Sequence, residues 1–261
     1  MKTIDLNCDM GESYGVYTLG RDPEVIRYIS SANIACGFHA GDPRVMSRTV
    51  ELATAHGVSV GAHPGFPDRL GFGRRQMDCS PEEIRDDVIY QVGALRAFCD
   101  VHGVKLQHVK PHGSLHNMAA ADESMLRTLA RAMAALDAKL LLVTLAGRDS
   151  EYMAQIGREE GIQIVFEAFP DRAYTAEGAL VSRKLPGAVI HDPMEAAERA
   201  VRMVKEGRVI AVDGSSIPMN AQTLCIHGDT PASLELACII RESLEREGIT
   251  VEPMGQSFQS H

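Results

Sequence analysis

Short apolar runs alternate with longer amphipathic stretches along the whole chain. Each run is continuously apolar rather than alternating in polarity, which is typical of strands that are covered on both faces, as in a parallel sheet. The predicted strands are residues 3–7, 33–36, 59–62, 106–109, 140–145, 163–168, 209–213 and 223–226. Stretches between them, such as 81–102 and 231–247, are long enough to be helices that connect parallel strands.

The boundaries of the predicted helices repeat two signals. A Pro that follows a capping side chain, as in Asp42-Pro43, marks a first helical position. A Gly followed by strand-forming residues, as in His56-Gly57, closes a helix and precedes the next strand. The chain is therefore a serial alternation of strands and helices.

This alternation favours a TIM-like (β/α) barrel over an open doubly wound sheet, because seven or eight such units fill about 250 residues. The segment 209–226 departs from the alternation. It has no room for a helix, and Asp213-Gly214 and Pro218 stand between its two apolar runs, which predicts a hairpin. We therefore expect a distorted, seven-stranded α/β barrel as one domain over residues 1–255, followed by a C-terminal tail over 256–261.

Composition and charge narrow the function classes. The 261 residues include 35 acidic and 26 basic side chains, a formal net charge of −9, which argues against nucleic acid as a partner. The longest strongly apolar run, 140–147, is far shorter than the ~20 residues that span a bilayer. No apolar signal segment precedes Asp5, so we expect a soluble, cytoplasmic protein without a membrane partner. The six cysteines form no CxxC pair and are expected to be free thiols.

Six polar segments follow predicted strands. They are DLNCDMGE (5–12), CGFHAGD (36–42), GAHPG (61–65), VKPHG (109–113), EAFPDRAY (167–174) and CIHGD (225–229). In a barrel the carboxyl ends of the strands gather at one mouth, and the catalytic groups stand there. We therefore expect all six segments to build one site.

Carboxylates and imidazoles in these segments suit acid–base or metal chemistry. Asp9, Glu12, His39 and His63 combine the two side-chain types. Such a set can hold a divalent metal ion or act as general acid and base. The residues by themselves leave both options open.

Positive charge and further imidazoles complete the set of candidates. Lys110 and Arg172, with Arg74 or Arg75 from a Gly-rich loop, suit the carboxylate or phosphate of a small anionic substrate. The remaining candidates at strand ends are His112, His227 and Asp229, the last of which also fits a helix cap.

Several common sites are absent from the sequence. There is no GxxxxGK[ST] loop and no GxGxxG after a strand, so a phosphate would not be bound in those ways. No GxSxG elbow supports a serine hydrolase mechanism. Four other histidines have structural interpretations, since His56 and His102 end helices and His116 and His191 lie near helix starts.

Six ordered motifs resemble the LamB/YcsF family. They are DLNCDMGESYG (5–15), IACGFHAGD (34–42), AHPGFPDRLGFGRR (62–75), VKPHGSLHN (109–117), EAFPDRAY (167–174) and CIHGDTP (225–231). The resemblance implies a seven-stranded β/α barrel similar to glycoside hydrolase and polysaccharide deacetylase barrels. It also implies ATP-dependent cleavage of 5-oxo-L-proline to L-glutamate, in a complex with subunits B and C. ATP would be the cosubstrate, and a divalent metal would be either Mg²⁺ with ATP or an ion bound in the site.

The resemblance places the candidate residues in the site, and the chemistry of lactam opening suggests a role for each of them. Asp9 or Glu12 would be the general base on water, and His63 or His112 the general acid at the leaving ring nitrogen. Lys110 would hold the substrate carboxylate or the developing phosphate charge together with Arg172. The substrate-binding set is Asn7, His39, Arg74, Glu167, Arg172, Tyr174, His227 and Asp229, and the candidate metal ligands are Asp9, Glu12, His39 and His63.

Two other functions fit the same residues. A metal-dependent amidase or deacetylase would act on a small amide or sugar without ATP. A non-catalytic subunit would bind the substrate and present it to partner subunits, which the absence of a recognisable ATP loop favours and the acid–base residues oppose.

Overall fold

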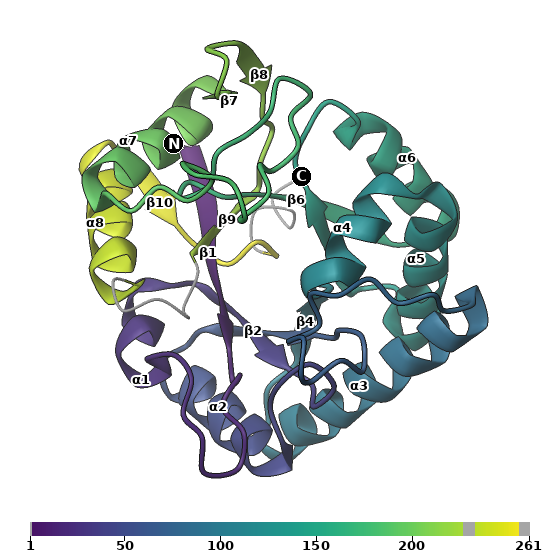
Figure 1. Cartoon of the computed structure of the whole chain (residues 1–261). Helices are drawn as coiled ribbons and strands as arrows, with labels where there is room; N and C mark the ends of the chain where they lie inside the picture. Colours follow the sequence, from purple (N-terminus) through teal and green to yellow (C-terminus); the bar gives the residue numbers. More distant parts are fainter. Residues whose placement is uncertain (1, 227–232, 256–261) are drawn as a thin grey trace.

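Seven parallel strands close into a barrel (Figure 1). The computed structural model describes residues 2–226 and 233–255. In order around the barrel the strands are β1 (Lys2–Met10), β2 (Ser31–Ala35), β3 (Ser59–His63), β4 (Leu106–Val109), β5 (Leu141–Leu145), β6 (Gln163–Ala168) and β9 (Thr223–Ile226). β9 pairs with both β6 and β1, and each contact between neighbours is parallel. The predicted seven-stranded barrel is confirmed.

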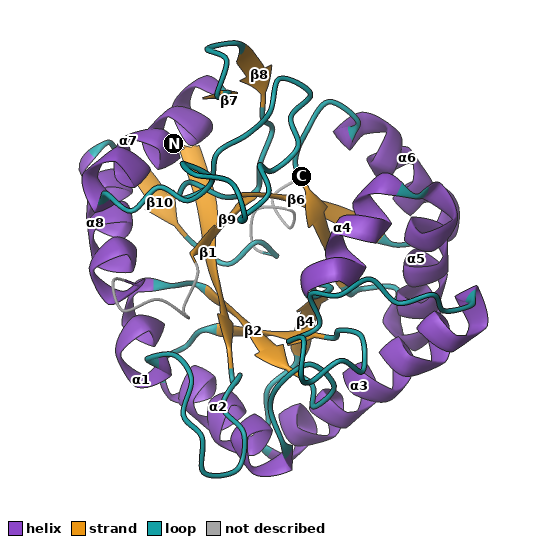
Figure 2. Ribbon diagram, in the orientation of Figure 1, coloured by secondary structure: helices purple, strands orange, loops and turns teal. Residues whose placement is uncertain are grey.

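Helices cover the outside of the barrel (Figure 2). The longer ones are α2 (Pro43–Ala55), α3 (Pro81–Val101), α5 (Glu123–Asp137), α6 (Ser150–Glu160), α7 (Pro193–Glu206) and α8 (Ser233–Arg246). A short α1 (Asp22–Val25) runs into a 3₁₀ turn, Ile26–Tyr28. The side chains of Asp42 and Ser80 accept backbone N–H groups at the starts of α2 and α3, so the caps that the sequence predicts are formed.

One helix stands apart from this outer ring. α4 (Gly113–Ala121) begins directly after the loop that follows β4, and it lies closer to the barrel axis than α5 and α6 do (Figure 2). This places α4 beside the mouth of the barrel, where it forms part of a cavity wall.

The hairpin predicted over 209–226 pairs different residues. β7 (Arg208–Ile210) pairs antiparallel with β8 (Ser216–Pro218), around a turn in which Asp213 accepts the Ser215 N–H. Residues 223–226 form the barrel strand β9 instead. The prediction was wrong in the second strand, because a three-residue strand with a single apolar side chain leaves no apolar run to detect. β10 (Ile249–Val251), which pairs with the start of β1, is equally short and was not predicted.

The barrel interior beside β1 is polar. Successive strand residues point to opposite faces, and the alternate residues Ile4, Leu6, Cys8 and Met10 pack in the main apolar core. Asp5, Asn7 and Asp9 point the other way and bond to polar side chains of neighbouring strands. The interior therefore carries a hydrogen-bonded polar chain that leads up to the mouth.

Three further expectations concern the chain as a whole. Within residues 2–226 and 233–255, no helix has the length and apolar character needed to cross a membrane. All six cysteines are free thiols, as predicted, and Cys8, Cys36 and Cys225 are buried. The predicted tail, 256–261, lies outside the described residues, and a single domain over 1–255 stays a prediction.

Candidate active site

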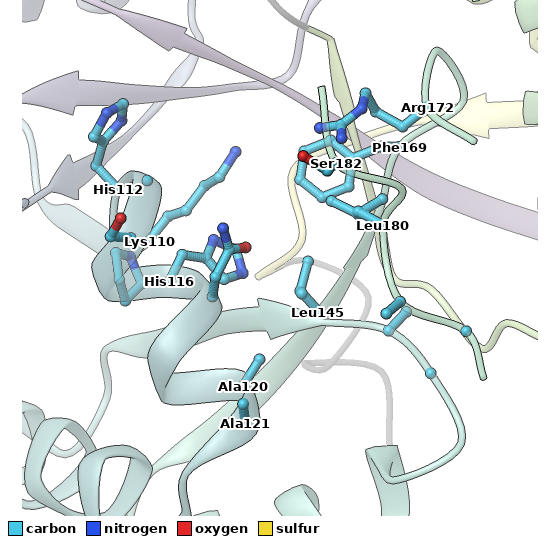
Figure 3. Close-up of a pocket in the computed structure, with 18 of the residues that line it drawn as sticks. Lys110, His112, His116, Ala120, Ala121, Leu145, Phe169, Arg172, Leu180 and Ser182 are labelled. Carbon is cyan, nitrogen blue, oxygen red and sulfur yellow. The ribbon is translucent and has the colours of Figure 1, made fainter. Parts of the chain in front are cut away.

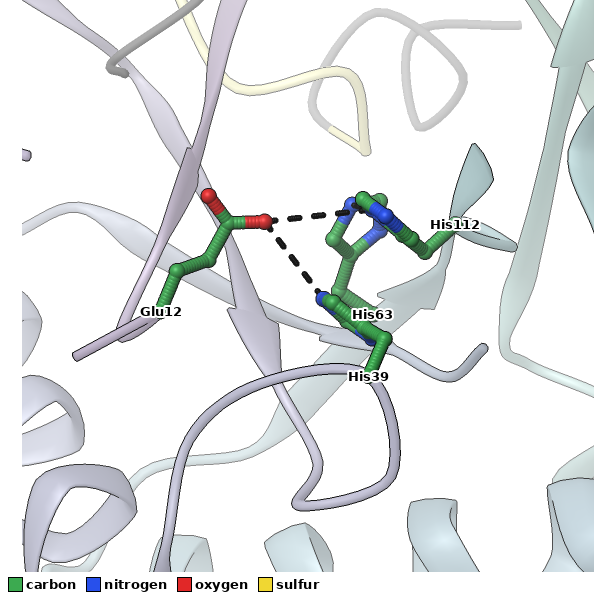
Figure 4. Close-up of side chains that lie close together, drawn as sticks. All are labelled: Glu12, His39, His63 and His112. Carbon is green, nitrogen blue, oxygen red and sulfur yellow. Dashed lines mark hydrogen bonds and ion pairs between the residues drawn. The ribbon is translucent and has the colours of Figure 1, made fainter. Parts of the chain in front are cut away.

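Predicted polar segments meet at the carboxyl end of the barrel. Glu12 follows β1, His39 follows β2, His63 ends β3, and His112 directly precedes α4. One ligand atom from each of these four buried side chains lies within 4.8 Å of the others (Figure 4). Parallel pairing brings them together, because the carboxyl ends of the strands lie at the same end of the barrel.

Within this cluster the imidazoles are in direct contact. The rings of His39 and His112 stack with their centroids 3.7 Å apart and their planes 2° from parallel. His63 Nε2 lies 2.9 Å from His112 Nδ1. Glu12 Oε1 lies 3.4 Å from His39 Nε2 and 3.8 Å from His112 Nδ1. Three ring nitrogens and one carboxylate oxygen thus converge on one point.

The Gly-rich loop after β3 packs against these rings. A Cβ on Gly65 would lie 2.9 Å from His39 Nδ1, and a Cβ on Gly73 would lie 2.8 Å from the Cβ of His39. Between them Phe72 has a φ of 55°, a conformation that non-glycine residues seldom adopt, and its carbonyl accepts the His112 Nε2 hydrogen bond at 2.8 Å. The glycines are therefore needed for the close approach of this loop to the cluster.

Proton counting on His63 and His112 indicates that the cluster binds a cation. His63 Nδ1 donates to the Lys110 carbonyl at 2.7 Å, and His112 Nε2 donates to the Phe72 carbonyl, because a carbonyl can only accept. In two neutral rings, the facing atoms His63 Nε2 and His112 Nδ1 would both carry lone pairs and repel each other at 2.9 Å. Their contact therefore needs a proton or a metal ion between them.

The donor set fits a divalent metal such as Zn²⁺. Imidazoles and carboxylates are ligands of this ion, which is most often four-coordinate. Backbone carbonyls orient the outer N–H groups of His63 and His112, as is usual for histidines that ligate metals. Glu12, His39 and His63 belong to the predicted metal set, and the structure groups them with His112 as the fourth ligand candidate.

Asp9, the other predicted metal ligand, lies beside the cluster. Its Oδ2 is 3.3 Å from His63 Nε2, and its Oδ1 is 2.9 Å from Lys110 Nζ. Burial alone would raise the pKa of the Asp9 carboxyl, but the charges of His63 and Lys110 outweigh this effect and hold the pKa well below its usual range. Asp9 is therefore an ionised carboxylate at the mouth of the barrel.

Lys110 is enclosed by acceptors. In addition to Asp9, its Nζ lies 2.7 Å from Glu167 Oε1, 3.1 Å from Asn7 Oδ1 and 3.1 Å from Cys225 Sγ. An ammonium group has three protons, so these contacts use all of them. Burial would lower the pKa of Lys110, but the negative charge around it raises that pKa well above its usual value. Lys110 thus provides the positive charge next to Asp9, and Asn7 and Glu167 hold the Lys110 ammonium group in place.

A cavity of about 640 Å³ opens beside the histidine cluster. Figure 3 shows Lys110, His112 and His116 on one side of it and Phe169, Arg172 and Ser182 on the other. We call the part lined by Asp9, His63, Lys110 and His112 the inner half. We call the part lined by Ala120 and Ala121, by residues 145–150 and by residues 177–180 and 182–184 the outer half.

The predicted substrate-binding residues are not all in this cavity. Arg74 and Arg172 line it, whereas Tyr174 does not, and the Tyr174 hydroxyl accepts the Phe169 N–H at 2.8 Å within the loop after β6. His227 and Asp229 lie outside the described residues.

Several residues that line the cavity were not predicted from the sequence. His116 was interpreted as structural, yet it lines the cavity wall, and its buried Nε2 has no hydrogen-bond partner among the described residues. Arg148, Arg183 and Lys184 also line the cavity and were not among the predicted site residues. A signal existed for Arg148, because the sequence AGRDS (146–150) is a polar segment after a strand, but it lacks the histidine that marks the others.

Comparison with known proteins agrees with the motifs. The sequence profile of the LamB/YcsF family matches residues 4–259. The A subunit of the 5-oxoprolinase of Natranaerobius thermophilus is 55% identical over 99% of each chain. The corresponding A subunit of Syntrophobacter fumaroxidans is 51% identical over 96% of this chain and 98% of its own.

Solved structures with this fold are also known. The lactam utilization protein from Thermus thermophilus has a TM-score of 0.89 and 51% identity, over 97% of this chain and 99% of its own. The polysaccharide deacetylase Bc1974 from Bacillus cereus has a TM-score of 0.50 and 12% identity, over 100% of this chain and 95% of its own, which is a likeness of fold alone.

Proposed function

The chain belongs to the LamB/YcsF family, and on that premise we propose that it is the lactam-opening subunit of an ATP-dependent 5-oxoprolinase. The reaction is the cleavage of 5-oxo-L-proline to L-glutamate, with ATP as cosubstrate and subunits B and C as partners. The observation that supports this most is the ionised Asp9 beside the imidazole cluster, at the end of a cavity with cationic walls. Asp9 as a base, the imidazoles as proton donors and the cationic side chains as a binding site for an anion are thus all next to one cavity.

The lactam needs activation, because its amide carbon is a poor electrophile. Transfer of the γ-phosphoryl group from ATP to the lactam oxygen forms a P–O bond, breaks the bond to the β-phosphate oxygen and releases ADP. Water then adds to the lactam carbonyl carbon, the ring C–N bond breaks, and the nitrogen leaves with a proton. The resulting acyl phosphate reacts with a second water to give L-glutamate and inorganic phosphate.

Asp9 is the residue best placed to accept a proton from the attacking water. It is ionised and lines the cavity, whereas Glu12, the other candidate base, does not line it. His63 and His112 both line the cavity. Burial and the charge of His63 lower the pKa of His112 to about 3, so a proton taken up between the facing nitrogens would be released readily to the leaving nitrogen. Arg172 and Arg74 provide positive charge for the substrate carboxylate or the phosphoryl group.

The histidine cluster can also hold a divalent ion, with Glu12, His39, His63 and His112 as its ligands. Such an ion would supply a Lewis acid for an oxygen of the substrate or of water. His63 and His112 would then be engaged as ligands, and Asp9 would be the group that takes a proton from water and gives it to the leaving nitrogen.

A metal-dependent amidase or deacetylase that works without ATP is the second candidate. The grouping of three imidazoles with one carboxylate favours it, since this donor set suits a catalytic metal. The requirement for ATP separates the two candidates.

Reconstitution with subunits B and C tests the proposal. We expect release of glutamate and ADP that depends on 5-oxoproline and is lost when any one subunit is omitted. Asp9→Asn and His112→Ala should each abolish glutamate release, while His56→Ala, at an exposed helix end, serves as the matched control. Glutamate release with a divalent metal and without ATP would favour the second candidate, and full activity in both site variants would refute the site.

A further inference from the structure

Four residues on four neighbouring strands form one row across the barrel wall. Asp9 of β1 is the register partner of Asn33 of β2, and Asn33 is the partner of Gly61 of β3. Gly61 is in turn the partner of His108 of β4. Asn33 and His108 are fully buried, whereas Asp9 lines the inner half of the cavity. The row therefore connects the barrel interior to the candidate base.

A bulge in β4 brings His108 into this row. The register of β3 against β4 shifts after Val60, so that Gly61 has His108 as its partner and Gln107 is the extra residue. A bulge of this kind changes the direction in which a side chain points. Gly61 leaves the space that the imidazole occupies, since a Cβ there would lie 2.0 Å from His108 Nε2. The ring of His108 can therefore reach across β3 toward β2.

The direction of the contact between His108 and Asn33 follows from counting protons. His108 Nε2 lies 2.8 Å from Asn33 Oδ1, and an amide oxygen only accepts. Burial and the charge of Lys110 lower the pKa of His108 to about 3, so its ring is neutral and has a single N–H to donate. That proton is on Nε2. His108 Nδ1 lies 3.1 Å from the Gln107 amide, which presents its NH₂ group to this nitrogen after rotation by half a turn.

Asn33 uses both protons of its amide on neighbouring oxygens. Its Nδ2 lies 2.7 Å from Asn7 Oδ1 and 2.8 Å from Asp9 Oδ1. With the amide turned round, its oxygen would face two acceptors, one of them the ionised Asp9 carboxylate. The hydrogen bond from His108 therefore favours the one orientation of the Asn33 amide that also donates to Asp9.

The two carboxylate oxygens of Asp9 have different surroundings. Oδ1 accepts from Asn33 at 2.8 Å and from Lys110 Nζ at 2.9 Å. Oδ2 lies 3.3 Å from His63 Nε2, on the side of the histidine cluster. Because Oδ1 already accepts two hydrogen bonds, Oδ2 is the oxygen left to take a proton from water in the cavity.

We propose that Asn33 and His108 are positioning residues for the opening of the lactam. His108 fixes the direction of the Asn33 amide, and Asn33 holds the Asp9 carboxylate with Oδ2 toward the reacting water. We call Asp9, Asn33 and His108 the relay. The inference rests on the proposed function, because the relay serves the base of that reaction. The described residues that line the cavity include neither Asn33 nor His108, so both act on the reaction only through Asp9.

Substitutions at His108 separate hydrogen bonding from packing. His108→Gln keeps an N–H group that can reach Asn33, whereas His108→Leu fills a similar volume without a donor. In the reconstituted complex we expect kcat for glutamate release to fall about tenfold or more in His108→Leu, because the base is no longer held in place. KM for 5-oxoproline should stay within about twofold, and His108→Gln should recover most of kcat.

Thr144→Val is the matched control for loss of a buried polar atom. Thr144 lies outside the relay, and its buried Oγ1 has no hydrogen-bond partner among the described residues. We expect this variant to keep the kcat of the wild type. A loss of kcat in His108→Gln as large as that in His108→Leu would overturn the proposal, since the donor would then not matter.

Asn33→Leu tests whether His108 acts through Asn33. If it does, His108→Leu should lower kcat by less than about twofold in the Asn33→Leu background, although it lowers kcat strongly in the wild type. Losses of kcat that simply multiply in the double variant would show that the two residues act independently, and they would overturn the relay.

The tautomer of His108 gives a readout that needs neither turnover nor a destabilised variant. NMR of the ¹⁵N-histidine-labelled chain, with His108→Gln to assign the signal, shows which ring nitrogen carries the proton. We expect a neutral ring with its proton on Nε2. A proton on Nδ1 would overturn the relay, because His108 could not then donate to Asn33. A wild-type complex that forms no glutamate would refute the proposed function, while an Nε2 proton would still support the hydrogen bonds of the relay.

Discussion

His63 Nε2 and His112 Nδ1 face each other at 2.9 Å although each ring already donates its other N–H to a backbone carbonyl. The residues come from the ends of neighbouring strands, and their contact is satisfied only with a cation between them. Glu12 and Asp9 supply negative charge next to that position. The end of the barrel is therefore built around a bound positive charge.

We predict that the protein binds one divalent ion at this position and releases about one proton when it does so, because the ion replaces the proton between the rings. Calorimetric titration with Zn²⁺ in buffers of different ionisation enthalpy measures both quantities. His63→Ala and His112→Ala should each weaken binding by about tenfold or more, and His56→Ala should not. Tight binding that survives both cluster substitutions would contradict the assigned ligands.

The raised pKa of the buried Asp5 carboxyl leads us to predict that the stability of the protein depends on pH. Burial raises the pKa of Asp5 from 3.8 to about 6, although Ser31, Thr223 and Ser30 donate hydrogen bonds to it. The folded state thus favours the protonated carboxyl, so the associated stability is complete below about pH 4 and is lost as pH rises through about 6. The difference corresponds to about 3 kcal/mol.

Asp5→Asn isolates this contribution, because an amide does not titrate. We expect the free energy of unfolding of the wild type, relative to that of the variant, to fall as pH rises from about 4 to 7. Urea unfolding at several pH values measures it. A difference between the two proteins that does not change with pH would show that Asp5 is not the titrating group.

We predict that any side chain at Gly61 of β3 destabilises the fold. This glycine lies opposite His108 of β4 in the sheet register, and a Cβ at Gly61 would come within 2.0 Å of His108 Nε2. We expect Gly61→Ala to lower the free energy of unfolding by about 1–3 kcal/mol through overpacking. Gly93→Ala, in the exposed interior of α3 with nothing near its Cβ, is the matched control and should stabilise by up to about 1 kcal/mol. Equal effects at the two positions would rule out crowding by His108.

We predict that the positive charge of Lys110 stabilises the ionised Asp9 carboxylate. Lys110→Met would leave the buried Glu167 carboxylate and the partly buried Asp9 carboxylate without their shared counter-charge, and we expect the free energy of unfolding to fall by about 3–5 kcal/mol. Lys110→Met/Glu167→Gln should recover part of this loss, since one charge is removed. Chemical denaturation of the three proteins measures it. A variant that keeps its stability but loses affinity for 5-oxoproline would instead make Lys110 a direct ligand of the substrate.

Local features of the chain carried most of the fold prediction. Helix caps such as Ser80 and glycines at helix ends act within one turn of backbone, so they can be recognised without knowing the rest of the molecule. The short strands β8 and β10 were missed because each has only three residues, too few for a recognisable apolar run, and each depends on pairing with another strand. The barrel itself followed from the repeated strand–helix unit.

For the site, the sequence identified side-chain types but not their neighbours. Histidines at the ends of apolar runs marked His39, His63 and His112 as a group. Which carboxylate lies among them depends on the directions of the side chains at the end of β1. In the structure Glu12 belongs to the histidine cluster, whereas Asp9 forms an ion pair with Lys110. His116 could not be recognised, because nothing in a helical sequence tells which face meets a cavity.

The sequence by itself determined the order of strands and helices, the polar segments at the strand ends and the family, since these are patterns along one chain. Tertiary structure alone decided the pairing of His63 with His112, the enclosure of Lys110 by four acceptors and the joining of Arg148 to the loop that carries Arg183. Each of these contacts joins residues that are distant in sequence. These contacts form only when the barrel closes, because closure fixes the positions of the strand ends relative to one another.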